Sequence, residues 1–539
     1  MNRSCVRLLA GAVVCGSLAL AAGCRSSAET TTASATTTVP PKAGGSVNFG
    51  LEADPNGLDP ARNAFDAPGK QVATNVFDTW TTLGADGSAQ PYLAERLDHN
   101  ADFTVWTLHL RAGVQFHDGS ALDAGAAVRS FDAFRSSPIT GVTLAAVKAT
   151  EAVDPLTVRI TLSSPWGTFP AMLYSQIGMP MAKAQIEDPL GQSHPIGTGP
   201  FELETWDLNQ SMRLVRNPHY WRSDASGTAL PYLDSVTFKV MPDGQGRISA
   251  LQRGDLDVIQ TRSIADNNEL DKLAGNPSYK IAHDPGMTES AFIALNSGKA
   301  PLDDLRVRQA VAYATDVRQL AADNGWPTDK LLDGPFAKGT PWHADVAYPG
   351  YDLAKAKALI ADYEADTGKQ VDIELTSPFD TKVLQEIVDQ WGAAGISAHA
   401  KVVDARVTVI NAVFGQYDAV FFSYYGYTDP DEHYFYWSGH SAAPVGSFSV
   451  NFSRQQDPAM DAALDRVHAS PDPTVRKEAL AVVQQRMADL VPYVWLYQLD
   501  WVIATRANVY QAHNVTLPDG SPAMPYRNGV FSLAETYVA

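Results

Sequence analysis

The residues that could do chemistry in this chain do not form any of the common catalytic patterns. The sequence has no GxSxG nucleophile elbow, no HExxH zinc motif and no phosphate-binding P-loop. All three cysteines, Cys5, Cys15 and Cys24, lie near the N-terminus, so the body of the chain has no thiol nucleophile and no internal disulfide. The sequence therefore predicts a protein that binds a ligand, is not an enzyme and needs no cofactor.

One segment has part of the spacing of a calcium-binding loop. Asp54, Asn56, Gly57 and Asp59 follow the pattern, but Phe65 stands at the twelfth position, where a bidentate Glu is required. The mismatch argues against calcium.

Two histidines, His433 and His440, could reach a metal chelate, because imidazole is the commonest protein ligand for metals. A single His beside an aromatic run is more often a hydrogen-bonded surface group. We expect no metal held by the protein's own side chains.

The elements that must position a binding site are helices and strands mixed along the chain. Asp352, Asp457 and Asp472 each precede a helical apolar pattern as an N-cap, the last two with proline at the first helical position. At 539 residues the chain exceeds the roughly 250–300 at which a single core stops growing, so an α/β protein of at least two domains is predicted. Strands are predicted at residues 104–110, 157–162, 236–240 and 371–375.

The chain is acidic and begins with a targeting segment. Its formal net charge of −19 argues against nucleic acid or a bare anionic membrane as partner. Arg3 and Arg7 precede an apolar run at residues 8–22, and residues 1–23 are predicted to be a signal peptide.

The sequence Leu-Ala-Ala-Gly-Cys at residues 20–24 resembles a bacterial lipoprotein processing box, although Ala rather than Leu stands three residues before the cysteine. Cys24 would then carry a lipid; the alternative is an ordinary secretory signal with an accidental cysteine. Residues 24–43 are rich in Ser, Thr, Ala and Pro and are predicted to be a flexible tether. The expected location is extracytoplasmic, anchored to the cell membrane through Cys24.

The segment Pro195–Trp221, PIGTGPFELETWDLNQSMRLVRNPHYW, is the most distinctive part of the sequence. Gly197, Gly199 and Pro200 favour a rigid turn, and an aromatic and basic cluster follows. These residue types suit packing and turn formation, so we interpret the segment as scaffold.

Together with its neighbours, this segment resembles the oligopeptide/dipeptide-binding family of extracellular solute-binding proteins. The similarity runs from about Gly44 to about Trp501 and consists of short pieces in family order. They are Gly44–Ser46, Leu58–Pro60, Tyr92–Glu95, Thr104–Leu122, PIGTGPF, RNPHYW, Ala250–Asp257, Leu302–Asp316, Tyr417–Asp418, Asp429–Asp431 and Arg476–Pro492.

The resemblance implies a two-lobed periplasmic-binding-protein fold of type II, which closes about a hinge. An extra α/β domain is inserted in the first lobe. Carried over by motif position, lobe one is 44–63, 195–285 and 505–539, the inserted domain is 64–194, and lobe two is 286–504.

The resemblance also implies a function and partners. The chain would be a monomeric, lipid-anchored receptor that captures peptides or peptide-like solutes between its lobes. It would deliver them to an ABC permease and ATPase complex. The alternatives are a non-peptide solute, such as an oligosaccharide, opine or metal chelate, and a non-transporting cell-envelope regulator.

Two segments are the predicted ligand contacts. Ala64, Phe65 and Asp66 match family positions that meet the ligand. The second segment lies in the aromatic window at residues 420–437, VFFSYYGYTDPDEHYFYW, where Phe421 and Phe422 are expected in the core. Its candidates are the hydroxyl-bearing residues and the turn that follows them, Tyr424, Tyr425, Gly426, Tyr427 and Asp429.

One departure leaves the solute class open. Peptide-binding members place an Asp shortly before the Asp-Pro turn, where it pairs with the ligand's ammonium group, but no acid lies between Asp418 and Asp429 here. A buried ammonium without a counter-charge would be costly. Either Asp429, Asp431, Glu432 or Asp66 takes over that role, or the ligand is not an unmodified peptide.

Overall fold

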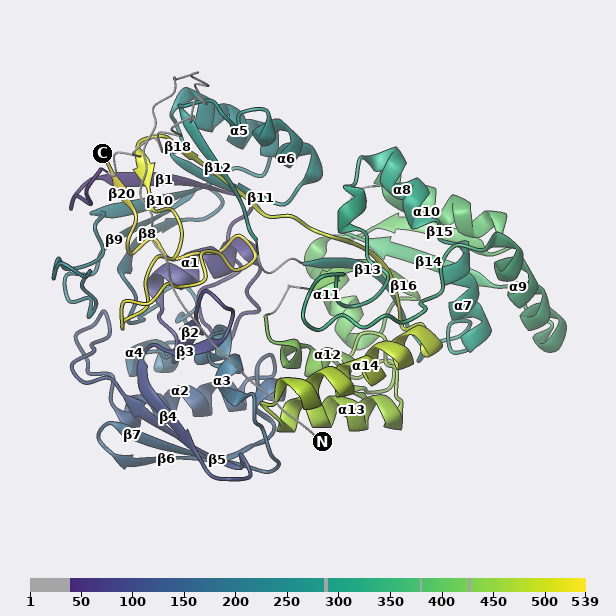
Figure 1. Ribbon diagram of the computed structural model, residues 1–539, viewed down its shortest axis with the longest axis horizontal. Helices are drawn as coiled ribbons and strands as arrows, with labels where there is room; N and C mark the ends of the chain where they lie inside the picture. The colour runs from purple at the N-terminus through teal and green to yellow at the C-terminus, as the bar shows by residue number, and fades with distance from the viewer. Residues whose placement is uncertain (1–38, 286–288, 379–380, 425–427) are drawn as a thin grey trace, which may run out of the picture. The chain divides into compact units, whose positions relative to one another are not determined.

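The computed structural model describes residues 39–285, 289–378, 381–424 and 428–539, and its largest sheet has β1 at its centre (Figure 1). β1 pairs in parallel with β10 on one side and β11 on the other. We refer to this seven-stranded sheet as sheet A. In sheet order, its strands are β12 (Tyr279–His283), β18 (Val502–Arg506), β11 (Val258–Thr261), β1 (Ser46–Leu51), β10 (Ser235–Val240), β9 (Ser211–Arg216) and β8 (Phe201–Asp207).

Three helices follow strands of sheet A along the chain, each with an acidic or hydroxyl N-cap that accepts a backbone N–H. They are α1 (Ala67–Val76), α5 (Gly244–Arg253) and α6 (Ile264–Asp271), capped by Asp66, Asp243 and Ser263. α1 is buried along most of its length. In Figure 1 it lies beneath the C-terminal segment of the chain, drawn in yellow.

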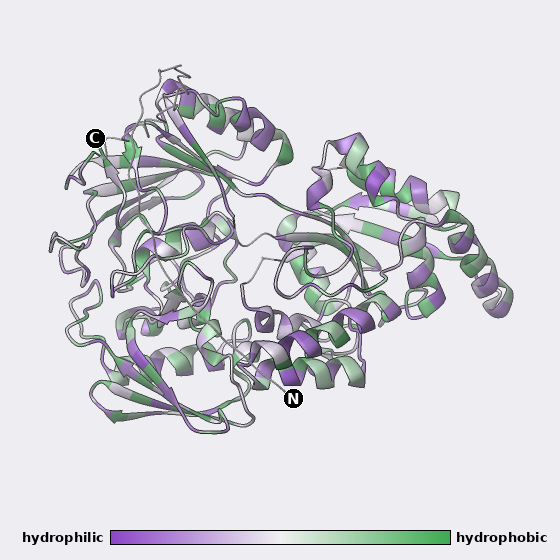
Figure 2. Ribbon diagram, viewed as in Figure 1, coloured by the Kyte–Doolittle hydropathy of each residue, from purple (hydrophilic) through white to green (hydrophobic). Residues whose placement is uncertain are grey.

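Sheet B is a four-stranded antiparallel sheet with the order β4-β5-β7-β6. β5 alternates between partly and fully buried residues, as expected for a sheet with one face on the core. Hydrophobic and hydrophilic residues alternate visibly along these strands in Figure 2. The elements of this region are β4 (Ala94–His99), β5 (Val105–Leu110), β6 (Val147–Asp154), β7 (Thr157–Leu162), α2 (Ala124–Ser136), η1 (Gly141–Leu144), α3 (Phe169–Met172), η2 (Gln176–Gly178) and α4 (Lys183–Glu187).

Sheet C has five strands in the order β15-β14-β16-β13-β17, parallel among the first three and antiparallel among the last three. Its strands are β13 (Ser290–Leu295), β14 (Asp372–Ser377), β15 (Ser397–Val402), β16 (Ala419–Tyr424) and β17 (Tyr493–Gln498). The longer helices around it are α7 (Leu305–Ala314), α8 (Val317–Asn324), α9 (Leu353–Thr367), α10 (Thr381–Ala393), α11 (Ala405–Phe414), α13 (Pro458–Ala469) and α14 (Pro473–Leu490).

Short elements complete the described residues. They are β2 (Thr81–Leu83), β3 (Ala89–Pro91), β19 (Val509–Tyr510), β20 (Tyr537–Val538), η3 (Thr328–Lys330), η4 (Pro430–His433), α12 (Tyr434–Trp437) and η5 (Gly439–Ser441). Among the described residues, none of the helices combines the length and the apolar character that a membrane span needs.

The helix and strand predictions are confirmed within a residue or two. Asp352, Asp457 and Asp472 cap α9, α13 and α14, as their spacing predicts. α14 ends at Leu490, and Val491 turns into the left-handed region with φ of 49° just before Pro492. The four predicted strands correspond to β5, β7, β10 and β14.

Two of the three larger sheets each lie within one predicted region of the chain. Sheet B lies within 64–194 and sheet C within 286–504, whereas β18 of sheet A crosses the predicted boundary at 504/505. Residues 41–539 form one compact unit. The assignment of these regions as domains stays a prediction.

The turn at Pro195–Pro200 packs against the end of α1, as the scaffold interpretation predicts. The Gly199 N–H donates to the Val76 carbonyl oxygen at 2.9 Å. A Cβ on Gly199 would lie 2.5 Å from the Val76 carbonyl carbon, and one on Gly197 would lie 2.2 Å from the Val76 oxygen. Backbone rather than a flexible side chain blocks both positions, so glycine is required by close approach.

We expect Gly199→Ala to lower the free energy of unfolding by about 1–3 kcal/mol, because overpacking forces the backbone apart. Urea denaturation measures the change. Gly392→Ala in α10 is the matched control: nothing lies within 4 Å of the added methyl group. That variant should gain roughly 0.5–1 kcal/mol. Equal stability of Gly199→Ala and wild type would contradict the packing role.

Candidate functional site

A cavity of about 270 Å³ lies where residues from the regions of sheets A, B and C meet. We call it the central cavity. Its walls are largely apolar, with a few charged and polar side chains, which is typical of small-molecule sites. It is lined by Ala64, Phe65, Lys70 and Thr74, by residues of 139–143 and 172–179, by Glu432, Phe435, Tyr436 and Val450, and by Arg527, Asn528 and Val530.

The loop before α1 is positioned by one side chain from the sheet B region. The Gln176 amide donates to the carbonyl oxygens of Pro60 and Asn63, both at 2.6 Å. Its Oε1 accepts from the Phe65 N–H at 3.3 Å. These bonds hold Ala64 and Phe65 at the cavity wall, although Gln176 lies 111 residues from Phe65 in sequence.

Helix α1 places two kinds of residue on neighbouring faces. Lys70 and Thr74, four residues apart, line the central cavity. Gln71 exchanges hydrogen bonds with the backbone of Phe531, at 2.9 and 3.2 Å. Asn75 accepts from the Leu533 N–H at 2.8 Å. The helix thus fixes the C-terminal segment while presenting Lys70 to the cavity.

Arg527 reaches the cavity because the C-terminal segment is held on α1. Its Nη1 donates to the Tyr174 carbonyl oxygen at 2.7 Å, and its guanidinium lies 4.9 Å over the Tyr174 ring. Two residues later the Gly529 N–H donates to Asp284 Oδ2 at 3.0 Å. Gly529 has φ of 72°, and a Cβ there would lie 2.6 Å from the Trp501 ring.

Glu432 is the acidic group of the central cavity, and it is almost fully buried. It accepts a hydrogen bond from the Tyr174 hydroxyl. Burial raises the pKa of the Glu432 carboxyl well above its usual range, and the charges of Arg527 and Lys70 oppose the shift.

The same loss of water that raises the pKa of Glu432 lowers the pKa of Lys70. Desolvation lowers the pKa of the Lys70 ammonium to about 7, while Glu289, Glu432 and Asp66 favour its charged form. Glu289 itself is buried and pairs with Arg262 Nη1 at 2.5 Å. Arg527 lines the same cavity, and its guanidinium would favour an anionic group on a ligand.

A second cavity, of about 590 Å³, has a lining that shares no residue with the first. Its lining includes Thr168, Trp342, Asp429, His433 and Arg476. Asp429 and Arg476 form an ion pair, and the Arg476 guanidinium lies 4.8 Å over the Trp342 ring. Burial raises the pKa of Asp429 even though Arg476 opposes the shift.

Asp431 joins the region of sheet C to that of sheet B. Its Oδ2 accepts from Trp166 Nε1 at 2.9 Å and from the Thr168 hydroxyl at 2.5 Å. His468 Nδ1 lies 3.0 Å from both carboxylate oxygens, and the His468 ring stacks between Trp166 and Tyr434. Burial opposes ionisation, but the imidazole charge and the hydrogen bonds hold the pKa of Asp431 below its usual range.

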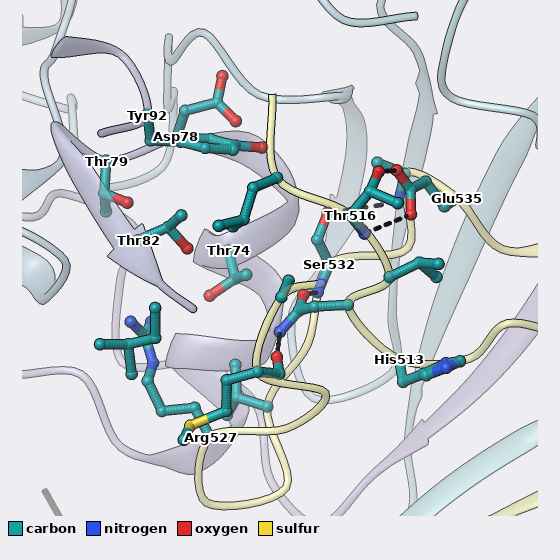
Figure 3. Close-up of a pocket in the computed structure, with 18 of the residues that line it drawn as sticks. Thr74, Asp78, Thr79, Thr82, Tyr92, His513, Thr516, Arg527, Ser532 and Glu535 are labelled. Carbon is teal, nitrogen blue, oxygen red and sulfur yellow. Dashed lines mark hydrogen bonds between the residues drawn. The ribbon is translucent and has the colours of Figure 1, made fainter. Parts of the chain in front are cut away.

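A third cavity, of about 70 Å³, lies beneath the C-terminal segment, and Figure 3 shows its lining. Asp78 accepts from Trp221 Nε1, the Thr198 hydroxyl and the Tyr220 hydroxyl at 2.9–3.1 Å. Burial raises its pKa to about 6.

Two other charged residues of this third cavity, Arg222 and Glu535, pair with each other, and Arg527 lines this cavity as well as the central one. Arg222 forms an ion pair with Glu535 at 2.9 Å. The Thr516 N–H donates a hydrogen bond to Glu535 Oε2 at 3.0 Å, as drawn in Figure 3. The RNPHYW motif thus supplies two Asp78 donors, Tyr220 and Trp221, just before Arg222. These contacts give the motif the packing role that the sequence predicts.

The predicted ligand contacts have different surroundings in the structure. Ala64 and Phe65 line the central cavity, whereas Asp66 caps α1 by accepting from the Gly69 N–H at 2.9 Å. Tyr424 is buried in the core of the sheet C region, with its hydroxyl 3.2 Å from that of Tyr493. Asp429 lines the second cavity. Tyr425, Gly426, Tyr427 and Cys24 lie outside the described residues, and the predicted contacts stay predictions.

Of the four acids proposed as a counter-charge, Glu432 lines the central cavity. Asp66 caps a helix, Asp429 pairs with Arg476, and Asp431 pairs with His468. Glu432 also has a contact within the fold, to the Tyr174 hydroxyl, but it is the one of the four that lines the central cavity, so it is the candidate that the geometry favours.

No group of three or more His, Cys, Asp or Glu side chains in the described part of the chain is arranged to hold a metal ion. His433 is buried and stacks on Trp437 with ring centroids 4.3 Å apart, so it is not the surface group that its sequence context favours. Burial lowers its pKa to about 3. His440 lies 3.5 Å from Asp465.

Sequence reasoning missed Lys70, Tyr174 and Arg527. A lone Lys inside an otherwise buried helix is a signal that could have found Lys70. Tyr174 and Arg527 follow no local motif. They reach the site through contacts with residues more than 250 positions away.

Comparison with known proteins places this geometry in a family. Residues 88–445 match the family model described as bacterial extracellular solute-binding proteins, family 5 middle. The nickel-binding periplasmic protein of Escherichia coli K12 is 26% identical over 458 residues, covering 80% of this chain and 85% of that protein.

Solved structures share the fold. A Helicobacter pylori periplasmic binding protein in complex with the peptide STSA has a TM-score of 0.79 and 22% identity, covering 92% of this chain and 98% of that one. The Bacillus subtilis oligopeptide-binding protein in complex with a nonapeptide has a TM-score of 0.78 and 20% identity, with coverage of 93% and 100%. The predicted periplasmic-binding-protein fold is confirmed.

The pKa of Lys70 makes a prediction that needs no ligand. Between pH 7 and 10.5 the unfolded chain holds a proton on this lysine that the folded chain has lost, so this group makes stability rise with pH across that window. Lys70→Met removes this contribution to the pH dependence of the free energy of unfolding. The wild type should therefore gain stability relative to Lys70→Met as pH rises from 7 to 10, by up to about 1.4 kcal/mol per pH unit.

Urea unfolding at pH 6, 8 and 10 measures this difference. Lys183→Met, on an exposed surface, is the control for loss of a lysine. Parallel pH profiles for wild type and Lys70→Met would contradict the assignment of a partly buried, destabilised ammonium at Lys70.

Proposed function

This chain belongs to family 5 of the bacterial extracellular solute-binding proteins, and from that premise we propose that it captures short peptides or peptide-like solutes in the central cavity. It is a solute-binding protein for ABC import and acts as a receptor, without catalysis. The proposed ligand carries a carboxylate that meets Arg527 and Lys70. The single observation that carries this proposal is a largely apolar cavity whose lining includes both of these basic residues.

The cavity also offers groups for the remaining polar atoms of such a ligand. Glu432 would pair with an ammonium group, whose charge would favour the ionised carboxylate. Thr74 also lines the cavity, and its buried hydroxyl has no hydrogen-bond partner among the described residues. Every polar ligand group that loses water needs such a partner, because burial without one costs several kcal/mol.

Hinge closure would complete the site. Residues of the sheet C region, Glu432, Phe435 and Tyr436, line the cavity opposite Lys70 and Arg527. A ligand that touches both walls makes contacts that an open form lacks, so it would shift the population toward the closed form. In this proposal the predicted lobes are the regions of sheets A and C, and sheet B belongs to the inserted domain.

A metal chelate is the second candidate. It is favoured by the similarity to the nickel-binding periplasmic protein. A chelate held by small carboxylate ligands would bind the same two cations through its carboxylates, without ligands from the protein.

Binding of tri-alanine and of its C-terminal amide tests the carboxylate contact. We expect the amide to bind about 10–100-fold more weakly, because a hydrogen bond to a charged group is worth about 1.5–3 kcal/mol. Arg527→Gln should reduce that difference to less than threefold, whereas the surface variant Arg213→Gln should keep it. Isothermal titration calorimetry gives the affinities.

Equal affinity of the acid and the amide in wild type would contradict the carboxylate contact. If a panel of di- to pentapeptides gives no thermal shift while an oligosaccharide does, the peptide proposal fails. A ligand at 100 times its Kd should stabilise the fold by roughly 2.7 kcal/mol, which such a shift detects.

We also propose that Cys24 carries a lipid that anchors the mature chain, with residues 24–43 as the tether. The sequence Leu-Ala-Ala-Gly-Cys supports this. Cys24→Ala should move the protein from the membrane fraction to the soluble fraction, whereas Cys15→Ala should not. Cell fractionation and immunoblotting measure both. Membrane association of Cys24→Ala equal to wild type would contradict the anchor.

A further inference from the structure

No residue lines both the central and the second cavity, but residues adjacent in sequence line one and the other, and we call the protein between the two cavities the wall. Met172 and Tyr174 line the central cavity, and Pro170 and Ala171, just before them, line the second. On the opposite side Glu432 lines the central cavity and His433 the second. Adjacent residues on both sides therefore face different cavities.

The side chain of Tyr174 spans this wall. Its hydroxyl donates to Glu432 and lies 3.4 Å from the hydroxyl of Thr428, which lines the second cavity. Its ring is buried with Leu83 and Ala171 in a small apolar cluster against which Met524 packs. Tyr174 therefore reaches from the region of sheet B to that of sheet C between the two cavities.

Several contacts hold Tyr174 in place. Arg527 bonds its carbonyl oxygen and covers its ring, so the same arginine lines the ligand cavity and supports the wall. Opening the wall would remove the hydroxyl from the buried Glu432 carboxyl. A buried acceptor that loses its donor costs roughly 1–3 kcal/mol, so a ligand must supply that free energy to pass.

The two cavities also differ in what they offer. The Asp429–Arg476 ion pair of the second cavity satisfies its two charges against each other, above the Trp342 ring. The central cavity contains Lys70 and Arg527 beside a single carboxylate, Glu432. In the proposed function the carboxylate of a solute binds in the central cavity, so a longer chain would have to cross the wall to occupy the second.

We propose that the Tyr174–Glu432 bridge is a partition that sets the length of the ligand. It confines the solute to the central cavity of about 270 Å³ and excludes it from the adjoining 590 Å³. Other proteins of this fold hold a tetrapeptide or a nonapeptide, so ligand length varies within the fold. This inference rests on the proposed function, since it assigns the length selectivity of the same site.

A ladder of alanine peptides from di-alanine to hexa-alanine, measured by calorimetry, tests the partition. Wild type should bind hexa-alanine at least tenfold more weakly than tri-alanine. Tyr174→Ala should reduce that ratio below threefold. Tyr174→Phe keeps the ring in its cluster and removes the hydrogen bond to Glu432, so it should lower the ratio at least threefold even if Tyr174→Ala does not fold.

Tyr232→Phe is the matched control. It removes a tyrosine hydrogen bond, to Asp224 at 2.6 Å, that is remote from these cavities, and it should leave the ratio unchanged. Equal binding of tri-alanine and hexa-alanine by wild type would overturn the partition. The partition would also be overturned if Tyr174→Phe and Tyr174→Ala showed the same ratio of tri-alanine to hexa-alanine affinity as wild type.

Failure of the peptide proposal gives a different result. If no alanine peptide binds any variant, the peptide class is wrong, and the partition is then tested by mass spectrometry of the solutes that copurify with each protein. Tyr174→Ala or Tyr174→Phe should retain heavier solutes than wild type. Identical mass distributions for wild type and both variants would overturn the partition whatever the solute class.

Discussion

Two acids buried where the three sheets meet accept hydrogen bonds across that junction. Asp431 and Glu432 are consecutive residues of the sheet C region, and both are almost fully buried. Asp431 is satisfied by Trp166 and Thr168, and Glu432 by Tyr174, all from the sheet B region. Because an unpaired buried carboxylate is costly, these contacts favour the arrangement that brings the two regions together.

Helix α1 is the second element on which the site depends. Gln71 and Asn75 bind backbone groups near the end of a 539-residue chain, while Lys70 and Thr74 on the adjoining face line the cavity. The glycines of the PIGTGPF turn let the chain pack directly on the end of the same helix. One buried helix thus couples the scaffold motif, the C-terminal segment and the cationic wall of the cavity.

The fold is largely predictable because its signals are local or recognisable in order along the chain. Asp457 followed by Pro458 specifies the start of α13, and the alternation at Thr157–Leu162 specifies β7. Family position alone points to Ala64 and Phe65, and both line the cavity. Residue type alone does not predict the surroundings of Tyr424. A tyrosine hydroxyl before a turn suits a cleft, but this hydroxyl lies next to that of Tyr493 inside the core.

The charged residues of the site are not predictable in the same way. Arg527 reaches the cavity because residues 460 positions apart, Gln71 and Phe531, are hydrogen-bonded, and no short pattern encodes such a pairing. The absence of an acid between Asp418 and Asp429 is visible in the sequence. The different roles of the neighbouring acids are not visible there. Asp429 pairs with Arg476 and Asp431 with His468, and only the packing of the folded chain brings these partners close. Glu432 lines the cavity.

The most direct test of the account is a crystal structure of the protein with tri-alanine bound. We expect the peptide in the central cavity, with its carboxylate within hydrogen-bonding distance, about 3.2 Å or less, of Arg527 and Lys70. We also expect an intact Tyr174–Glu432 bridge. A peptide lying in the second cavity, or one whose carboxylate contacts neither cation, would contradict this expectation.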